Sequence, residues 1–301
     1  MSQTVAIDPH ENRTLGIILM LGAFLAYTGI DAQSKVMAEI GYHAIFITWG
    51  RLVAQLVLMV PYMIQTGLPG LKSRRLDLQI ARGLCMLVAG VLFVMGLGHL
   101  PLATMTAINF VSPFIITILA MIVLKEAVGI HRWLAIVIGF TGAMIVIRPG
   151  TEAFSVASLY GLGAALFWAT SIIVTRVVQR YDSSMLTIFY TIIVGIGGSS
   201  FLVIEYWKEV NLLAMVFLFG MAVCSTVGQL LMNGALKQTS PAVLAPLNYS
   251  QLLWAGLVGA IVFSEFPDRW TWVGAGVIVI SGLYVWHRER QPAAPKPRPA
   301  E

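Results

Sequence analysis

Charged residues are scarce in this chain. Only 11% of the 301 residues are Asp, Glu, Lys or Arg, whereas 58% are hydrophobic. Ordinary soluble domains carry about 25% charged residues, so the composition excludes a soluble globular protein. Apolar stretches of about 20 residues recur along the sequence, and each is long enough to cross a hydrocarbon core of about 30 Å as a helix. We therefore expect an all-α integral membrane protein embedded in the lipid bilayer.

Residues and motifs for catalysis or cofactor binding are also scarce. The two cysteines, Cys85 and Cys224, lie inside apolar stretches and indicate neither a disulfide framework nor a metal site. No Walker A motif is present, which argues against direct coupling to ATP, and no loop exceeds about fourteen residues. We expect no cofactor, no metal and no enzymatic activity. The alternative functional class is a membrane-embedded enzyme or a sensor.

Ten membrane-spanning helices are predicted from the apolar stretches and from the Gly and Pro residues that separate them. Their expected ranges are 15–37, 44–65, 79–100, 101–124, 129–147, 157–178, 185–204, 212–236, 241–264 and 269–287. The polar segment 1–14 lacks the features of a signal peptide. The Pro-rich tail 288–301 is expected to be disordered.

The basic residues indicate an orientation rather than a nucleic-acid partner. The formal net charge is +5, but Lys and Arg are scattered over short loops and form no patch with aromatic residues. An even number of spans puts both termini on one side, and fourteen of the nineteen Lys and Arg residues fall on that side, against four on the other. The positive-inside rule then places both termini in the cytoplasm. We expect a multi-pass protein of the bacterial inner membrane.

The two halves of the sequence repeat one another. The stretch GAFLAYTGIDAQSK aligns without a gap on GAALFWATSIIVTR, which places Tyr27 on Trp168. At an offset of 139 residues, Asn109 falls on Asn248. Polar and aromatic positions match as well as apolar ones, which favours an internal duplication over chance similarity.

An odd number of spans in each half requires the second half to enter the membrane from the opposite face. The repeats are expected at 15–147 and 157–287, with five helices each. Inverted repeats recur in secondary transporters, where the substrate binds near the midplane and access alternates between the two sides. The predicted fold is thus ten transmembrane helices in two inverted five-helix repeats.

Two longer segments carry a resemblance to a known family. They are FVSPFIITILAMIVLKEAVGIHRWLAIVIGFTGAMIVIRPG and LAPLNYSQLLWAGLVGAIVFSEFPDRWTWVGAGVIVISGLY. The chain resembles the drug/metabolite transporter superfamily, with two EamA-type repeats over almost its whole length. The resemblance implies a secondary carrier with a central cavity for a small-molecule substrate. Glu126 and Glu265, which recur once per repeat, are interpreted as helix-end caps that pair with Arg132 or Arg269.

Asp31 is the one acidic residue inside a predicted span. A charged side chain at the centre of a spanning helix costs about 2.5–3.5 kcal/mol on insertion scales, so such residues usually face a cavity or a partner. Arg51, in the second span, is also a charged residue that must face a cavity or a partner. Two interpretations stay open for this pair, namely a site for a substrate amine, a cation or a proton, and a structural ion pair.

Further candidate site residues are polar or aromatic side chains at equivalent points of the repeats. Asn109 and Asn248 either brace the two halves or bind a polar solute, because buried amides must be hydrogen-bonded. Tyr249 and Gln251 lie one and three positions after Asn248 and belong to the same candidate site.

The aromatic residues Tyr27 and Trp168 suggest a substrate class. A planar heterocycle could stack between them, and the stretch LAPLNYSQLLWAGLVGAIVFSEFPDRWT resembles the branch of the superfamily that contains bacterial riboflavin transporters. Riboflavin or a similar heterocycle is the first hypothesis. An amino acid or S-adenosylmethionine is the alternative, with Asp31 as partner of the ammonium or sulfonium group. The direction of transport, the coupling ion and the oligomeric state stay open, and a homodimer is compatible with the sequence.

Overall fold

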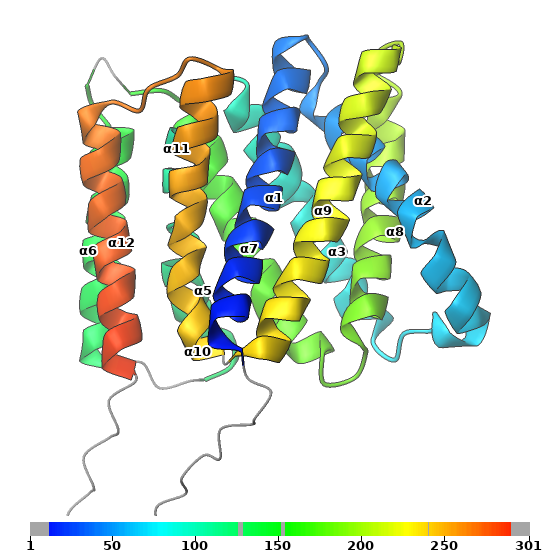
Figure 1. Cartoon of the computed structure of the whole chain (residues 1–301), viewed down its shortest axis with the longest axis horizontal. Helices are drawn as coiled ribbons and strands as arrows, with labels where there is room; N and C mark the ends of the chain where they lie inside the picture. Colours follow the sequence, from blue (N-terminus) through cyan, green and yellow to red (C-terminus); the bar gives the residue numbers. More distant parts are fainter. Residues whose placement is uncertain (1–11, 126–128, 152–153, 240, 290–301) are drawn as a thin grey trace, which may run out of the picture.

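The protein is an all-helical bundle (Figure 1). The structure is a computed structural model that describes residues 12–125, 129–151, 154–239 and 241–289, and these ranges contain no β-strand. Glu126 lies outside the described residues, as do most of the predicted N-terminal segment and tail. The helices are α1 (Arg13–Glu39), α2 (Ala44–Gly70), α3 (Leu76–Leu97), α4 (Leu102–Asn109), α5 (Ser112–Val123), α6 (Ile130–Ile147), α7 (Ser158–Val178), α8 (Ser184–Val203), α9 (Leu212–Gln238), α10 (Pro241–Leu244), the 3₁₀ helix η1 (Ala245–Tyr249), α11 (Ser250–Val262) and α12 (Arg269–Glu289).

Several of these helices have the length and composition of membrane spans. Within the described ranges, seven segments qualify when α4 and α5 are taken as one, and α6 adds a shorter apolar stretch, Trp133–Ile147. In α2 the qualifying stretch is Ala44–Pro61. Beyond it the helix is interrupted at Gly67, where φ is 66°, in the left-handed region that favours glycine. The all-α prediction is confirmed.

Two predicted helices are interrupted in their first half. The helix expected over 101–124 stops at Asn109 and resumes at Ser112, and the one expected over 241–264 contains the 3₁₀ turn η1. The prediction of continuous helices was wrong at these two places. The physical reason is proline, since Pro113 and Pro246 have no N–H to donate to the preceding turn.

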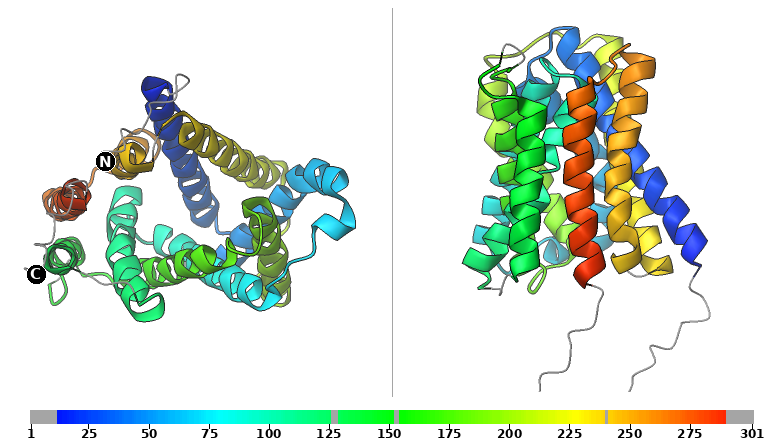
Figure 2. Two further views of the ribbon diagram at one scale, coloured as in Figure 1. Left: turned by 90° about the horizontal axis from the view of Figure 1, so that it is seen from below. Right: turned by 90° about the vertical axis from the view of Figure 1, so that its left-hand side faces the viewer.

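Three helix pairs make the most extensive contacts. They are α1 with α9, α3 with α7, and α6 with α12. Figure 2 shows that α6 and α12 stand together at one edge of the bundle. Small residues allow these close approaches, which is how helices pack in lipid. For example, Gly228 of α9 leaves room for the ring of Tyr27 on α1.

The tightest backbone approach is between α6 and α12. A Cβ atom added at Gly274 would lie 2.5 Å from the carbonyl oxygen of Gly142 and 3.0 Å from the amide nitrogen of Val146. Overpacking of this kind costs about 1–3 kcal/mol. We therefore expect Gly274→Ala to lower the melting temperature of the detergent-solubilised protein by several degrees.

The matched control for that substitution lies on the same helix. A Cβ at Gly276 would meet no atom within 4 Å, and alanine is favoured over glycine in a helix by about 1 kcal/mol. Gly276→Ala should leave the melting temperature unchanged or raise it slightly. Equal losses from the two substitutions would contradict the packing explanation.

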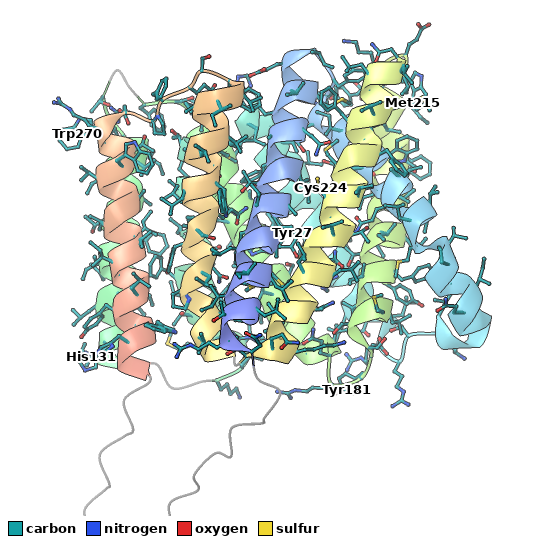
Figure 3. All side chains as sticks on the ribbon, viewed as in Figure 1. Tyr27, His131, Tyr181, Met215, Cys224 and Trp270 are labelled. Atoms are coloured by element: carbon teal, nitrogen blue, oxygen red, sulfur yellow. The ribbon has the colours of Figure 1, made fainter. Side chains whose placement is uncertain are left out.

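The bundle has two distinct ends. The terminal end is where α1 begins and α12 ends, and the other is the opposite end. Figure 3 shows His131 and Tyr181 at the terminal end, and Met215 and Trp270 at the opposite end. Because Tyr181 follows α7, that helix ends where α1 begins, so the two run in opposite directions.

At the terminal end, Asp182 joins the two halves of the chain. Its carboxylate accepts hydrogen bonds from the Ser73 hydroxyl, from the Arg74 amide nitrogen at 3.0 Å and from Gln79 Nε2 at 2.9 Å. Asp182 is only 8% exposed. Burial alone would raise the pKa of the Asp182 carboxyl, but these hydrogen bonds and the charge of Arg74 hold it below its ordinary value.

This environment predicts a pH-dependent contribution to stability. A carboxyl whose folded-state pKa is depressed stabilises the fold above its unfolded pKa of about 3.9, and the contribution is lost as pH falls through the folded-state pKa. We expect Asp182→Asn to lower the melting temperature by roughly 4 °C at pH 7, since hydrogen bonds to charged groups are worth about 1.5–3 kcal/mol. The difference from the unsubstituted protein should shrink below about pH 4. A difference that persists undiminished at pH 3 would contradict the assignment.

At the opposite end, Lys35 and Glu265 form a buried ion pair. Lys35 Nζ lies 2.6 Å from Glu265 Oε1 and donates to the carbonyl oxygen of Leu100 at 3.1 Å, and the Lys35 side chain is 3% exposed. The Leu102 amide donates to Glu265 Oε2 at 3.3 Å. The prediction that Glu265 pairs with Arg269 was wrong. The Arg269 guanidinium lies instead over the Trp270 ring, 5.5 Å from its centroid.

Candidate functional site

Asp31 is held by an amide and not by a cation. It lies about two thirds of the way along α1 from the terminal end, and Gln251 Nε2 on α11 donates to its Oδ2 at 3.3 Å. The structure thus brings together two predicted site residues that are 220 positions apart. A carboxylate has about four acceptor positions, so this one bond leaves Asp31 free to bind a further donor or cation.

Arg51 is the positive charge that acts on Asp31, but the two side chains do not form a salt bridge. Their charges interact. Ion pairs within 4.0 Å, among the described residues, join Lys35 to Glu265, Arg75 to Asp77, and Arg148 to Asp268. Arg51 is half-buried on α2. The arrangement is an opposite-charge pair whose members interact without forming a closed salt bridge.

The polar residues that follow Asp31 on α1, Gln33 and Ser34, contact α1 itself and α9. Gln33 Nε2 donates to the Gly29 carbonyl oxygen at 2.9 Å and lies 3.5 Å from Cys224 Sγ on α9. The Ser34 hydroxyl donates to the Ile30 carbonyl oxygen at 2.8 Å. These polar groups are satisfied within α1 and at the α1–α9 contact, which leaves Asp31 as the polar group of α1 directed to α11.

The two aromatic residues predicted to stack on a heterocycle occupy different surroundings. Tyr27 lies at the α1–α9 contact, with its hydroxyl 3.9 Å from Met232 Sδ (Figure 3). Trp168, on α7, is 40% exposed. No ring contact within the described residues joins them. The Trp168 indole is thus partly exposed, whereas the Tyr27 ring is packed against Gly228.

The two helix breaks meet each other. Phe110 follows Asn109 at the end of α4, and Tyr249 ends η1, and the centroids of their rings are 5.4 Å apart. Asn109 and Asn248, the two predicted amides, differ in environment. Asn248 is exposed, whereas Asn109 Oδ1 is buried without a hydrogen-bond partner.

Two further buried polar atoms near these breaks lack partners. They are Ser250 Oγ and Trp254 Nε1, one turn apart on α11 and on either side of Gln251. Neither Ser250 nor Trp254 was predicted from the sequence as a polar site residue. The signal available was their spacing of four positions next to Gln251, which puts them on one helix face.

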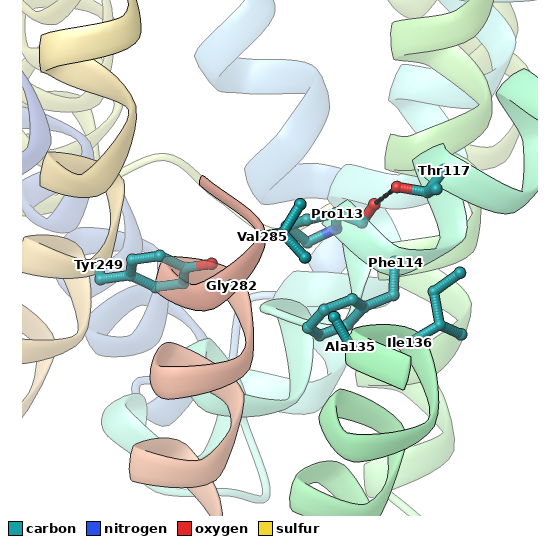
Figure 4. A pocket seen from close by; sticks show the side chains of 8 residues that line it. All are labelled: Pro113, Phe114, Thr117, Ala135, Ile136, Tyr249, Gly282 and Val285. Carbon is teal, nitrogen blue, oxygen red and sulfur yellow. Dashed lines mark hydrogen bonds between the residues drawn. The ribbon is translucent and has the colours of Figure 1, made fainter. Parts of the chain in front are cut away.

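A small cavity lies beside the site, between α5, α6, α12 and η1. It has a volume of about 100 Å³ and is lined by Pro113, Phe114, Thr117, Ala135, Ile136, Tyr249, Gly282 and Val285 (Figure 4). Gly282 leaves room for the Tyr249 hydroxyl. Sites for drug-sized ligands measure about 300–1,000 Å³, so this cavity is too small to be the whole substrate site. In the part of the chain that the structure describes, no three His, Cys, Asp or Glu side chains are grouped as a metal site requires.

A helical bundle of apolar spans with a charged pair and unpaired polar atoms inside it is typical of a membrane transporter. The chain belongs to the EamA-like transporter family, whose sequence profile matches residues 14–148 and again residues 155–286. It is therefore a multi-pass membrane transporter of small molecules and not an enzyme.

Similar proteins carry two different substrate names. The chain is 26% identical over 289 residues to an S-adenosylmethionine uptake transporter of Rickettsia bellii, covering 96% of this chain and 99% of that protein. It is 25% identical over 274 residues to a riboflavin transporter of Vibrio cholerae, covering 90% and 92% of the two chains. A solved crystal structure matches with a TM-score of 0.60 at 11% identity, covering 90% of this chain and 99% of that one, which shows a shared fold.

Proposed function

We propose that the chain is a ten-span secondary transporter built of two inverted repeats. In this reading α1 corresponds to α7, and α3 corresponds to α9. If each helix is replaced by its equivalent in the other repeat, the α1–α9 pair becomes the α7–α3 pair. Both pairs are among the most extensive helix contacts, as this symmetry requires. The pair α6–α12 is converted into itself. The opposite directions of α1 and α7 further support inversion.

The contact between the two breaks supports a two-fold axis through the middle of the bundle. Phe110 and Tyr249 are equivalent positions at the offset of 139 residues, and equivalent residues touch each other only near such an axis. Their ring contact at 5.4 Å therefore carries the proposal that the substrate site lies here, between the halves. Inverted-repeat transporters bind substrate at this place, near discontinuous helices.

For the substrate we propose a zwitterionic organic cation of the S-adenosylmethionine type. The supporting observation is the separated pair of Asp31 and Arg51, in which the carboxylate has one amide partner and the guanidinium has no closed salt bridge. Asp31 would bind the ammonium or sulfonium group, and Arg51 would bind the substrate carboxylate with the geometry that guanidinium favours. The named function of the Rickettsia relative agrees with this chemistry.

Riboflavin is the second candidate. It is favoured by the 40% exposed indole of Trp168 and by the Phe110–Tyr249 ring pair, since flat rings of this kind stack on heterocycles. The Vibrio cholerae relative carries that name. A neutral heterocycle, however, would give neither Asp31 nor Arg51 a charged partner in direct contact.

For the orientation we propose that the terminal end faces the bacterial cytoplasm. The start of α1 and the end of α12 lie together there (Figure 1), and the sequence puts fourteen Lys and Arg residues on that side against four on the other. The positive-inside rule supports this orientation in the inner membrane.

Uptake into protein-only liposomes tests the proposed function. Labelled S-adenosylmethionine and labelled riboflavin would be supplied separately, without ATP. We expect saturable uptake of S-adenosylmethionine above the rate of empty liposomes. Uptake of riboflavin alone would replace the first candidate by the second, and uptake of neither would contradict both.

A further inference from the structure

Three polar atoms on the two broken helices are buried and have no hydrogen-bond partner. They are Asn109 Oδ1, Ser250 Oγ and Trp254 Nε1. A buried polar group without a partner costs about 1–3 kcal/mol, and no water is available in the hydrocarbon core to satisfy it. Unpaired polar atoms of this kind indicate a place where a ligand completes the hydrogen bonds.

The three residues belong to one neighbourhood. Asn109 and Ser250 are the chain neighbours of Phe110 and Tyr249, whose rings are in contact. Trp254 is four positions after Ser250 and shares its face of α11. Gln251, between them, holds Asp31. Ser250 and Trp254 thus share α11 with Gln251, the partner of Asp31 in the charged part of the proposed substrate site.

Their chemistry is complementary to a particular kind of ligand edge. An amide oxygen accepts, an indole N–H donates, and a hydroxyl does either. A heteroaromatic ring that presents an N–H donor beside a ring or carbonyl acceptor satisfies both requirements at once. An aminopurine edge and the imide edge of a flavin share this pattern, whereas an aliphatic amino acid has no such edge.

We propose that Asn109, Ser250 and Trp254 form a subsite that binds the donor–acceptor edge of the substrate's heterocycle. The inference rests on the proposed transport function and deepens it. Asp31 and Arg51 select for charge, and the subsite selects for the heterocycle. Because a site built to hydrogen-bond a ligand group strongly rejects an analogue that lacks it, the subsite makes the transporter discriminate between heterocycle-bearing substrates and simple amino acids.

Ligand-dependent thermal stabilisation of the purified full chain tests the subsite. S-adenosylmethionine and riboflavin are titrated separately at the melting temperature of each ligand-free protein, and the concentration that gives half of the maximal gain in the folded fraction is recorded. We expect Ser250→Ala and Trp254→Phe each to raise that concentration about tenfold for the ligand that binds, because each removes one hydrogen-bonding partner of a buried group.

The matched control is Ser281→Ala. Ser281 is buried on α12, and its hydroxyl already donates to the carbonyl oxygen of Ile278 at 2.8 Å. Its removal should leave the half-maximal concentration within twofold. The melting temperature without ligand shows whether each variant is folded, and Ser250→Thr, which keeps the hydroxyl, replaces Ser250→Ala as the informative variant if the latter unfolds. Retained affinity in the threonine variant, beside lost affinity in Trp254→Phe, then supports the subsite.

The outcomes separate the two levels of the proposal. A response to S-adenosylmethionine supports the purine edge, and a response to riboflavin alone supports the flavin edge. If the unsubstituted protein binds a ligand and the Ser250 and Trp254 variants bind it equally well, the subsite is contradicted and the transport function stands. If the unsubstituted protein binds and transports neither ligand, the proposed function itself is overturned, and the subsite with it.

Discussion

Replacing Asp31 by asparagine is expected to reduce the rate of S-adenosylmethionine uptake at low substrate concentration by at least about 30-fold. Truncating one member of a buried, hydrogen-bonded charge pair costs about 2–5 kcal/mol, and roughly 2 kcal/mol corresponds to this factor. Asparagine keeps an oxygen that can accept from Gln251 Nε2, which bonds Asp31 at 3.3 Å, so the substitution removes the charge and preserves the α1–α11 contact. The measurement is initial uptake into proteoliposomes.

A second aspartate provides the control. Asp77 is in the first turn of α3, its side chain is 62% exposed, and it pairs with Arg75 at the surface. Asp77→Asn should change uptake by less than twofold. The melting temperature of Asp31→Asn without ligand shows whether the variant remains folded. Uptake at the normal rate by Asp31→Asn would show that Asp31 is not the recognition residue.

The helical architecture could be predicted because it depends on local properties of the sequence. Apolar stretches of the right length specify spanning helices whatever their partners. The positions of the two helix breaks could not be predicted from the length of the apolar stretches. Pro113 was visible, but many membrane helices keep a proline without interruption, because neighbouring groups satisfy the freed carbonyls. Proline makes the gap between Asn109 and Ser112 possible, and the gap is accompanied by packing of α4 against α11 and by the Phe110–Tyr249 ring contact.

The partners of the polar residues depend on contacts between distant parts of the chain. Asp31 was identified as costly from its position alone, but its partner Gln251 lies 220 residues away. The same holds for Lys35 and Glu265, which are 230 residues apart. A nearby arginine therefore looked like the partner of Glu265, although the fold places the lysine there. Alignment of the repeats identifies equivalent residues such as Tyr27 and Trp168. It does not predict how deeply each side chain is buried.

Replacing Lys35, which pairs with Glu265 at the end of the bundle opposite the termini, is expected to have the largest effect on stability. In Lys35→Met, Glu265 would remain with a charge that no longer has its partner at 2.6 Å. Breaking a buried pair in this way costs about 3–5 kcal/mol. Because the Glu265 side chain is 27% exposed, we expect the lower part of that range, or a fall in melting temperature of roughly 5–10 °C. Thermal unfolding in detergent measures it.

The double variant Lys35→Met with Glu265→Gln separates a buried-charge effect from a packing effect. Glutamine can still accept from the Leu102 amide, which donates to Glu265 Oε2 at 3.3 Å, and no uncompensated charge remains. We expect the double variant to regain most of the lost stability, which corresponds to a coupling energy of about 2 kcal/mol or more. The exposed pair of Arg75 and Asp77, with side chains 41% and 62% exposed, should give a coupling of about 0–1 kcal/mol in the same cycle. Additive losses at Lys35 and Glu265 would mean that packing of the lysine stem, and not its charge, joins α1 to the α11–α12 connection.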